Sequence, residues 1–360
     1  MSDEKSKSTS DDADIPLLEC APLSGGSVAD EGFKPKVILS IGPDRMLALG
    51  EDTGLILHML PAEEAAVHMK RESSSSSSSL VVDTGAEPYG VLALEKGIAC
   101  PFEDPEGGFD AALVDGKVYV FGTGPQDRHT TTLDTLALHV LDCTTLEWQT
   151  RRYPSWSIGS PAARYKPHLF CLKGKLCAVG GEGIDGDSCG RMDVFDPRSG
   201  CWIVGVCTTP HMWHGCDRFV VIKDVVHYFS GRSHHTYSLG GKWRTTKTKF
   251  SSEGVWDTQV YGTNVALFKR HGVVILFDTV TGRHSVRHMS QGLCRMPHGV
   301  QIDNVTVWSE GTLSRNYVMK HDSSLYAHVR KSSEGGAESD SEGDLDGLIA
   351  TPKGQHYVCI

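Results

Sequence analysis

Short apolar segments that end in glycine recur along the middle of the chain. Four of them run apolar or alternate apolar and polar residues: 117–122 (KVYVFG), 175–181 (KLCAVGG), 225–231 (VVHYFSG) and 305–311 (VTVWSEG). Each has the length of a β-strand, and the glycine at its end breaks the strand. The pattern therefore predicts strands, and no helical period of comparable strength competes with it.

A second strand, a turn and an aromatic residue complete the recurring unit. The second strand is clearest at 137–142 (ALHVLD), 192–196 (MDVFD) and 273–278 (VVILFD), each ending in Asp. A leucine or aromatic residue at the end of this strand is followed at a nearly constant distance by the next large ring. The distance is seven residues for Leu141 and Trp148, for Phe195 and Trp202, and for Phe277 and His284, and it is six for Tyr237 and Trp243. We expect each Trp to begin an outer strand and to pack between neighbouring units.

This self-similarity has a period of roughly 40–55 residues, with four strands per unit, which is typical of β-propeller blades. The chain contains 39 glycines, which suits many short strands joined by tight turns. We therefore expect an all-β propeller of about six blades, with five or seven left open. The expected blades are 33–95, 108–155, 164–208, 213–250, 256–290 and 297–330.

The unit around residue 180 resembles the kelch repeat. Val179-Gly180-Gly181, then Phe195-Asp196-Pro197 and Trp202, are similar to the family pattern of an apolar strand, a double glycine and a spaced Trp. The resemblance covers roughly 108–310; the other units depart from it, with Gly-Thr-Gly at 122–124 and Ser-Gly at 230–231. It implies a kelch-type propeller closed by an N-terminal strand, and protein binding as its use.

The resemblance is to divergent, plant-like kelch proteins, many of which are similar to adaptors for ubiquitin ligation that carry an F-box ahead of the propeller. Residues 1–31 are too short and too polar to form that helical domain. The resemblance therefore implies that the chain binds a protein partner. One version of this role is that of a ubiquitin-ligase component.

Charge is concentrated at the two ends of the chain. Residues 1–31 carry −6 and residues 331–346 carry −5, so the rest, out of a total of −10, is close to neutral at +1. We expect a disordered acidic segment at 1–31, a propeller at 33–330 and a disordered acidic tail at 331–360. The serine run Ser73–Ser79 is expected to be a long loop inside the first blade, because it lies between strand-like residues 55–59 and 80–82. A near-neutral centre also argues against nucleic-acid binding.

Nothing in the sequence predicts secretion or membrane insertion. The first residues lack an apolar targeting segment, and no apolar stretch approaches 18 residues. We therefore expect a cytoplasmic or nuclear protein. Its 11 cysteines, among them Cys143, Cys171, Cys177 and Cys201, have no CxxC pair and are expected to be buried thiols.

Several charged and aromatic residues fall in predicted loops at the ends of strands. Loops on one face of a propeller commonly form a shared binding surface, and Arg, His and Trp are effective contact residues. Ordinary solvated loops would have the same composition. The candidate partner-binding residues are Arg128, Arg164, His168, Trp213, His214 and Arg232.

No pattern for catalysis, a cofactor or a metal is evident. The chain has no GxSxG, Walker, HExxH or GxGxxG motif in a suitable context. His211, His214 and Cys216 are zinc-type ligands but fit a loop equally well, and 182–187 (EGIDGD) is expected to be a solvated turn. A metal-dependent or small-molecule enzyme that uses the central pocket is the alternative function.

The acidic tail suggests a modification. Ser339 and Ser341 each have an acidic residue three positions later, Glu342 and Asp344, which is similar to the sites of acidophilic kinases. Phosphorylation would add charge to an already acidic segment. The alternative is a tail that only improves solubility.

Overall fold

Antiparallel strands form all the regular structure of the described residues. The computed structural model describes residues 21–22, 37–42, 44–50, 53–60, 91–101, 108–122, 135–154, 160–162, 164, 167–181, 189–209, 218–269, 273–288, 299–302, 305–309 and 316–320. Within these residues no helix is long and apolar enough to cross a membrane.

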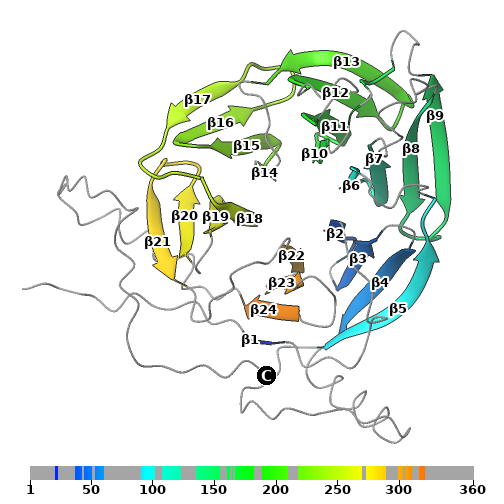
Figure 1. Cartoon of the computed structure of the whole chain (residues 1–360), viewed down its shortest axis with the longest axis horizontal. Coiled ribbons are helices and arrows are strands. Elements are labelled where there is room, and N and C mark those ends of the chain that lie inside the picture. Colours follow the sequence, from blue (N-terminus) through cyan, green and yellow to red (C-terminus); the bar gives the residue numbers. More distant parts are fainter. Residues whose placement is uncertain are drawn as a thin grey trace, which may run out of the picture.

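The strands form six four-stranded antiparallel sheets arranged in a ring (Figure 1). Five sheets use four consecutive strands each. The first is β2 (Val37–Ser40), β3 (Arg45–Leu49), β4 (Thr53–Leu60) and β5 (Val91–Ala99); the second is β6 (Asp110–Val114), β7 (Lys117–Phe121), β8 (Thr135–Asp142) and β9 (Trp148–Pro154); the third is β10 (His168–Leu172), β11 (Lys175–Val179), β12 (Arg191–Asp196) and β13 (Cys201–Thr208). The fourth is β14 (Arg218–Ile222), β15 (Val225–Ser230), β16 (Ser233–Tyr237) and β17 (Arg244–Lys247); the fifth is β18 (Val255–Tyr261), β19 (Asn264–Lys269), β20 (Val273–Asp278) and β21 (His284–His288).

The remaining sheet joins the two ends of the chain. It contains β22 (Gly299–Ile302), β23 (Val305–Ser309) and β24 (Asn316–Lys320), and its outer strand is β1 (Ala21–Pro22), which pairs with β24. An N-terminal strand therefore completes the last sheet, as the resemblance implied. The strands nearest the centre of the ring are β2, β6, β10, β14, β18 and β22 (Figure 1). The all-β propeller expectation is confirmed.

The recurring spacing of seven residues corresponds to a hairpin between the third and fourth strands. In three sheets the two residues of the spacing are direct cross-strand partners: Leu141 and Trp148, Phe195 and Trp202, and Phe277 and His284. Side chains at directly opposite positions lie on the same side of a sheet and contact each other. The constant spacing in the sequence therefore results from a constant turn length between the third and fourth strands.

Asp at the end of the third strand fixes this turn. The Asp196 carboxylate accepts a hydrogen bond from the Arg198 amide at 3.0 Å, and the Asp196 carbonyl accepts one from the Gly200 amide at 2.8 Å. Gly200 has φ 68°, which favours glycine. Asp142 and Asp278 accept the same kind of hydrogen bond, so Asp serves as the side-chain acceptor of this turn in three sheets.

Trp at the start of the outer strand packs between sheets, as expected. Trp202 is 7% exposed and belongs to a core cluster with Leu136 and Leu138 of the preceding sheet. Its ring lies 5.2 Å from that of Phe121 and 5.3 Å from that of Phe195. Neighbouring sheets are therefore joined by aromatic packing, which contributes roughly 0.5–1.5 kcal/mol per pair beyond area burial.

Two-residue turns connect the first two strands of several sheets. At 115–116 and 173–174 the second turn residue is glycine, whereas at Lys223 and Asp224 both residues are non-glycine with φ of 48° and 60°. Such turns favour Asn or Asp followed by Gly.

Replacing Lys223 by Asn should therefore raise the free energy of unfolding by about 0.5–1 kcal/mol, because Asn tolerates positive φ better than Lys. Urea denaturation would measure the change. Lys242→Asn, at an exposed lysine without positive φ, is the matched control and should leave stability within about 0.5 kcal/mol. If both variants change the free energy of unfolding equally, the positive φ of Lys223 does not strain the turn.

Several sequence expectations concern residues outside those described. These are the serine run, the strand at 80–82, the acidic loop at 182–187, most of residues 1–31 and the tail at 331–360.

Candidate functional site

Connections of unequal length separate the two faces of the ring. Because consecutive strands are antiparallel, the link from the second to the third strand and the link to the next sheet leave from one face, which we call the loop face. His168 pairs with Val179, and Val179 pairs with Met192, so the start of β10, the end of β11 and the start of β12 lie at the same face of the ring. Longer connections begin and end at the loop face: 122–134, 155–167, 180–190, 209–217 and 289–298.

The opposite face is closed mainly by short turns. Residues 115–116, 173–174, 223–224 and 262–263 connect first and second strands there. Residues 61–90, which include the serine run, are the exception. The two faces therefore differ in the length of the connections that begin and end there.

Arg232 and His168 occupy the loop face. Arg232 lies in the turn between β15 and β16, its side chain is exposed, and its carbonyl accepts a hydrogen bond from the Thr248 amide at 3.0 Å. His168 is half-buried at the start of β10, with its ring 5.2 Å from that of Phe219 on β14. Arg232 is therefore accessible to solvent, while His168 is held against the next sheet.

Three other predicted contact residues, Arg128, Trp213 and His214, lie outside the described residues. So do His211 and Cys216 of the zinc-type cluster and the two tail serines, Ser339 and Ser341.

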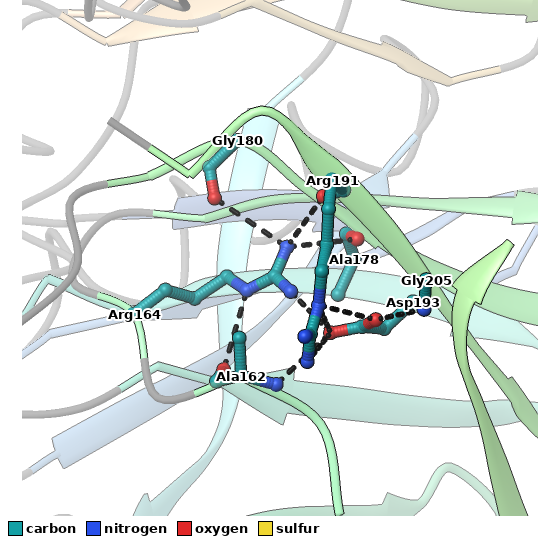
Figure 2. Close-up of polar contacts among 7 residues, drawn as sticks. All are labelled: Ala162, Arg164, Ala178, Gly180, Arg191, Asp193 and Gly205. Carbon is teal, nitrogen blue, oxygen red and sulfur yellow. Dashed lines mark hydrogen bonds and ion pairs between the residues drawn. The ribbon is translucent and has the colours of Figure 1, made fainter. Parts of the chain in front are cut away.

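Arg164 is buried, and its predicted exposure is wrong. It retains only 1% of its accessible surface, because the segment before β10 turns the side chain inward beneath the loop face. The guanidinium forms an ion pair with Asp193 of β12, whose side chain is also fully buried (Figure 2). Arg164 therefore belongs to the internal structure and is not presented to a partner.

Every side of the Arg164 guanidinium is hydrogen-bonded. Nη1 donates to the carbonyls of Ala178 and Arg191 at 3.1 and 3.0 Å, and Nε donates to that of Ala162 at 3.3 Å (Figure 2). Burial lowers the pKa of Arg164, and the Asp193 carboxylate opposes this shift. An arginine so paired keeps its charge, so the site is a satisfied buried ion pair.

Asp193 sits at a β-bulge that makes its carboxylate accessible to several donors. The register between β12 and β13 shifts between Met192 and Val194, and Gly205 opposite has φ 64°. The Asp193 carboxylate accepts hydrogen bonds from the amides of Gly205 at 2.7 Å and Ala162 at 3.0 Å. One carboxylate thus joins the segment before β10 to two outer strands of the third sheet.

Arg191 connects this internal pair with the surface. Its Nε lies 3.0 Å from the Asp193 carboxylate, and its side chain is 40% exposed. A cation at the loop face is therefore held in a fixed orientation by a buried anion. One signal of this arrangement is visible in the sequence, where the charged Asp193 lies inside the otherwise apolar run 192–195.

A pair of buried histidines lies between the fourth and fifth sheets. His227 Nδ1 and His234 Nε2 are 3.0 Å apart, and each residue is 6% exposed. The His234 ring lies 4.7 Å from that of Phe229 and 4.8 Å from that of Phe277 on β20. Burial lowers the pKa of both histidines to about 4, so both are neutral near pH 7. The two histidine rings pack as part of the aromatic core. The sequence analysis did not predict this pair.

The described residues contain no group of three or more His, Cys, Asp or Glu side chains that could hold a metal ion. Cysteines among them are free thiols with different environments. Cys143 and Cys177 are buried, Cys171 is half-buried, and Cys201 is exposed. Burial raises the pKa of Cys177 to about 12, so this thiol is not reactive near neutral pH.

The fold defines an all-β propeller, and comparisons with known proteins agree at that level. The chain is similar to a solved structure titled "Structure of YjhT", with a TM-score of 0.54 and 13% sequence identity, over 82% of this chain and 96% of that one. At this identity the likeness concerns the fold alone. No family model and no curated protein sequence matches the chain.

Proposed function

We propose that this chain is a kelch-type propeller, with the six sheets as its blades, that acts as a non-enzymatic scaffold or adaptor for a protein partner. The partner binds at the loop face. The observation that carries the proposal is the asymmetry of the ring, which gathers long connections and an exposed Arg232 at one face. Contact residues on loops positioned by a rigid scaffold are a common arrangement for binding.

The buried Arg164–Asp193 pair supports this use of the loop face. It joins the backbone at Ala162 to β11 and β12 before any partner arrives. A surface that is already ordered loses less conformational entropy on binding, which increases affinity. The same carboxylate orients Arg191, so at least one cation at this face is pre-organised.

The kelch resemblance extends the proposal to cellular context. We infer a cytoplasmic or nuclear adaptor, and recruitment of a substrate to a ubiquitin ligase is the particular form suggested by the family.

Replacing Arg232 by Glu should reduce capture of the partner at least fivefold, because it reverses an exposed charge at the loop face. Affinity capture from the native organism, quantified by mass spectrometry, would measure the loss. Lys223→Glu reverses a charge in a turn on the opposite face and is the matched control.

Enrichment of no protein by the unmodified chain, or equal enrichment by both variants, would refute binding at the loop face. Metal analysis of the purified protein addresses the enzymatic alternative, because stoichiometric iron or zinc would contradict a pure scaffold.

A further inference from the structure

Cations, all but the half-buried Arg287 exposed, gather on and beside the outer strands of the fourth and fifth sheets. Residues 238–252 and 279–288 contain no acidic residue. In the structure these segments include β17, all four residues of which are exposed, and β21. We call the following six residues the basic seam: Lys242, Arg244, Lys247, Lys249, Arg283 and Arg287.

The two segments are adjacent in space. The ring of Phe250, which follows β17, lies 5.0 Å from that of His284 on β21. Burial lowers the pKa of His284, and the positive charge of Lys249 lowers it further. Cations from the two sheets therefore share one surface at the rim of the ring, where β17 and β21 are neighbouring outer strands (Figure 1).

Several basic residues of the first three sheets form ion pairs, whereas the residues of the seam are a cluster of cations without acidic partners among the described residues. Arg45 pairs with Glu95 at 2.7 Å, and Lys117 pairs with Asp142 at 3.5 Å. Within the described part of the chain, no ion pair involves any of the six seam residues. Among the described residues, the side-chain hydrogen bonds from the seam go to neutral acceptors, from Lys247 to the Ser233 hydroxyl and from Arg287 to the Val286 carbonyl.

The seam also offers an apolar position. Val286 of β21 is 37% exposed, and the sheet register places it on the same side of the sheet as His284. Six uncompensated cations near an exposed aliphatic side chain favour a ligand with many separate carboxylates on a flexible backbone. An acidic polypeptide segment has this chemistry.

We propose that the basic seam binds the acidic segment 331–346 of the same chain. That segment carries −5, with six acidic residues and one lysine. The last described strand, β24, belongs to the sheet next to the fifth, and β22 of that sheet contacts β18.

The residues that link β24 to the acidic segment set how far that segment can reach. β24 ends at Lys320, and the stretch from there to residue 331 spans at most about 35–40 Å when extended. Attachment to the same chain gives an effective concentration in the range of roughly millimolar, so weak individual ion pairs suffice. Phosphorylation of Ser339 or Ser341 would add charge and strengthen the contact.

Zero-length carbodiimide crosslinking of the full chain tests the proposal, because it joins lysine amines only to carboxylates in contact with them. We expect Lys242, Lys247 and Lys249 to crosslink to residues 331–346, with a yield independent of protein concentration. Lysines away from the seam, such as Lys96 and Lys223, should give at least fivefold less of this product.

A pair of charge reversals separates a specific contact from proximity. Arg244→Glu with Arg283→Glu keeps the three reporting lysines and should reduce their crosslinks to 331–346 at least fivefold. Arg152→Glu with Arg198→Glu, at exposed arginines of the second and third sheets, is the matched control and should leave them unchanged.

Crosslinks spread evenly over all lysines, insensitivity to Arg244→Glu with Arg283→Glu, or a yield that rises with protein concentration would each overturn the proposal. The last result would assign the seam to a second copy. The readout involves no other protein, so it is independent of partner binding at the loop face.

Discussion

Replacing Asp193 by Ala should lower the free energy of unfolding by about 3–5 kcal/mol, which is the usual result of removing one partner of a buried ion pair. The Arg164 guanidinium would remain charged and inaccessible to water. The amides of Ala162 and Gly205 would lose their acceptor as well. Equilibrium denaturation in urea, followed by tryptophan fluorescence, would measure the loss.

Two comparisons separate the buried ion pair from a general effect of truncation. Arg191→Ala removes a side chain that contacts the same carboxylate but is 40% exposed, and should cost at most about 1 kcal/mol. Arg164→Met with Asp193→Leu removes both charges and should be less destabilising than the sum of its single variants, since neither leaves an unpaired ion. If Asp193→Ala has no larger effect than Arg191→Ala, the pair does not hold this part of the fold together.

Acidification should destabilise the propeller between about pH 6.5 and pH 4 through the buried pair His227 and His234. The pKa of each is lowered from 6.5 to about 4 by burial. In this window the unfolded chain binds protons that the folded chain excludes, so stability is complete above pH 6.5 and falls as the pH falls. Each histidine contributes a slope of up to roughly 1.4 kcal/mol per pH unit.

The double variant His227→Phe with His234→Phe should flatten this dependence. Phenylalanine retains the ring that packs against Phe229 and Phe277, and it cannot be protonated. Urea denaturation at a series of pH values from 7 to 4 would show a slope reduced by at least about 1 kcal/mol per pH unit. His58→Gln, at a half-exposed histidine of the first sheet, should leave the slope unchanged; equal slopes for all three proteins would contradict the role of the buried pair.

Both predictions bear on the proposed binding role. Asp193 fixes the backbone at the loop face, so a variant that loses the ion pair should also lose order where the partner binds. The histidine pair lies between the fourth and fifth sheets, and its protonation would loosen the contact between them.

Much of the fold could be predicted from the sequence because its determinants are local. The separation of Phe195 from Trp202 is set by one turn, with Asp196 as acceptor and Gly200 at positive φ. Each of these residues acts within a few positions of the others, so the same spacing recurs wherever the turn recurs. Repetition of the unit then indicated a propeller, because one four-stranded unit cannot bury both of its faces alone.

The candidate site was less predictable because its residues meet only after the sheets have formed. Arg164 resembled a solvated loop cation in the sequence, and its partner Asp193 is 29 positions away in another strand. His227 and His234 lie on neighbouring strands, and only the register of β15 and β16 places their rings together.

The sequence alone determined the strands, their turns and the propeller class, since hydrogen bonding and packing within one hairpin depend on neighbouring residues. Only the tertiary structure decided which charges are buried, which histidines are paired and which cations are left without acidic partners. Burial and charge pairing depend on what other sheets place beside a residue, and that is a property of the closed ring.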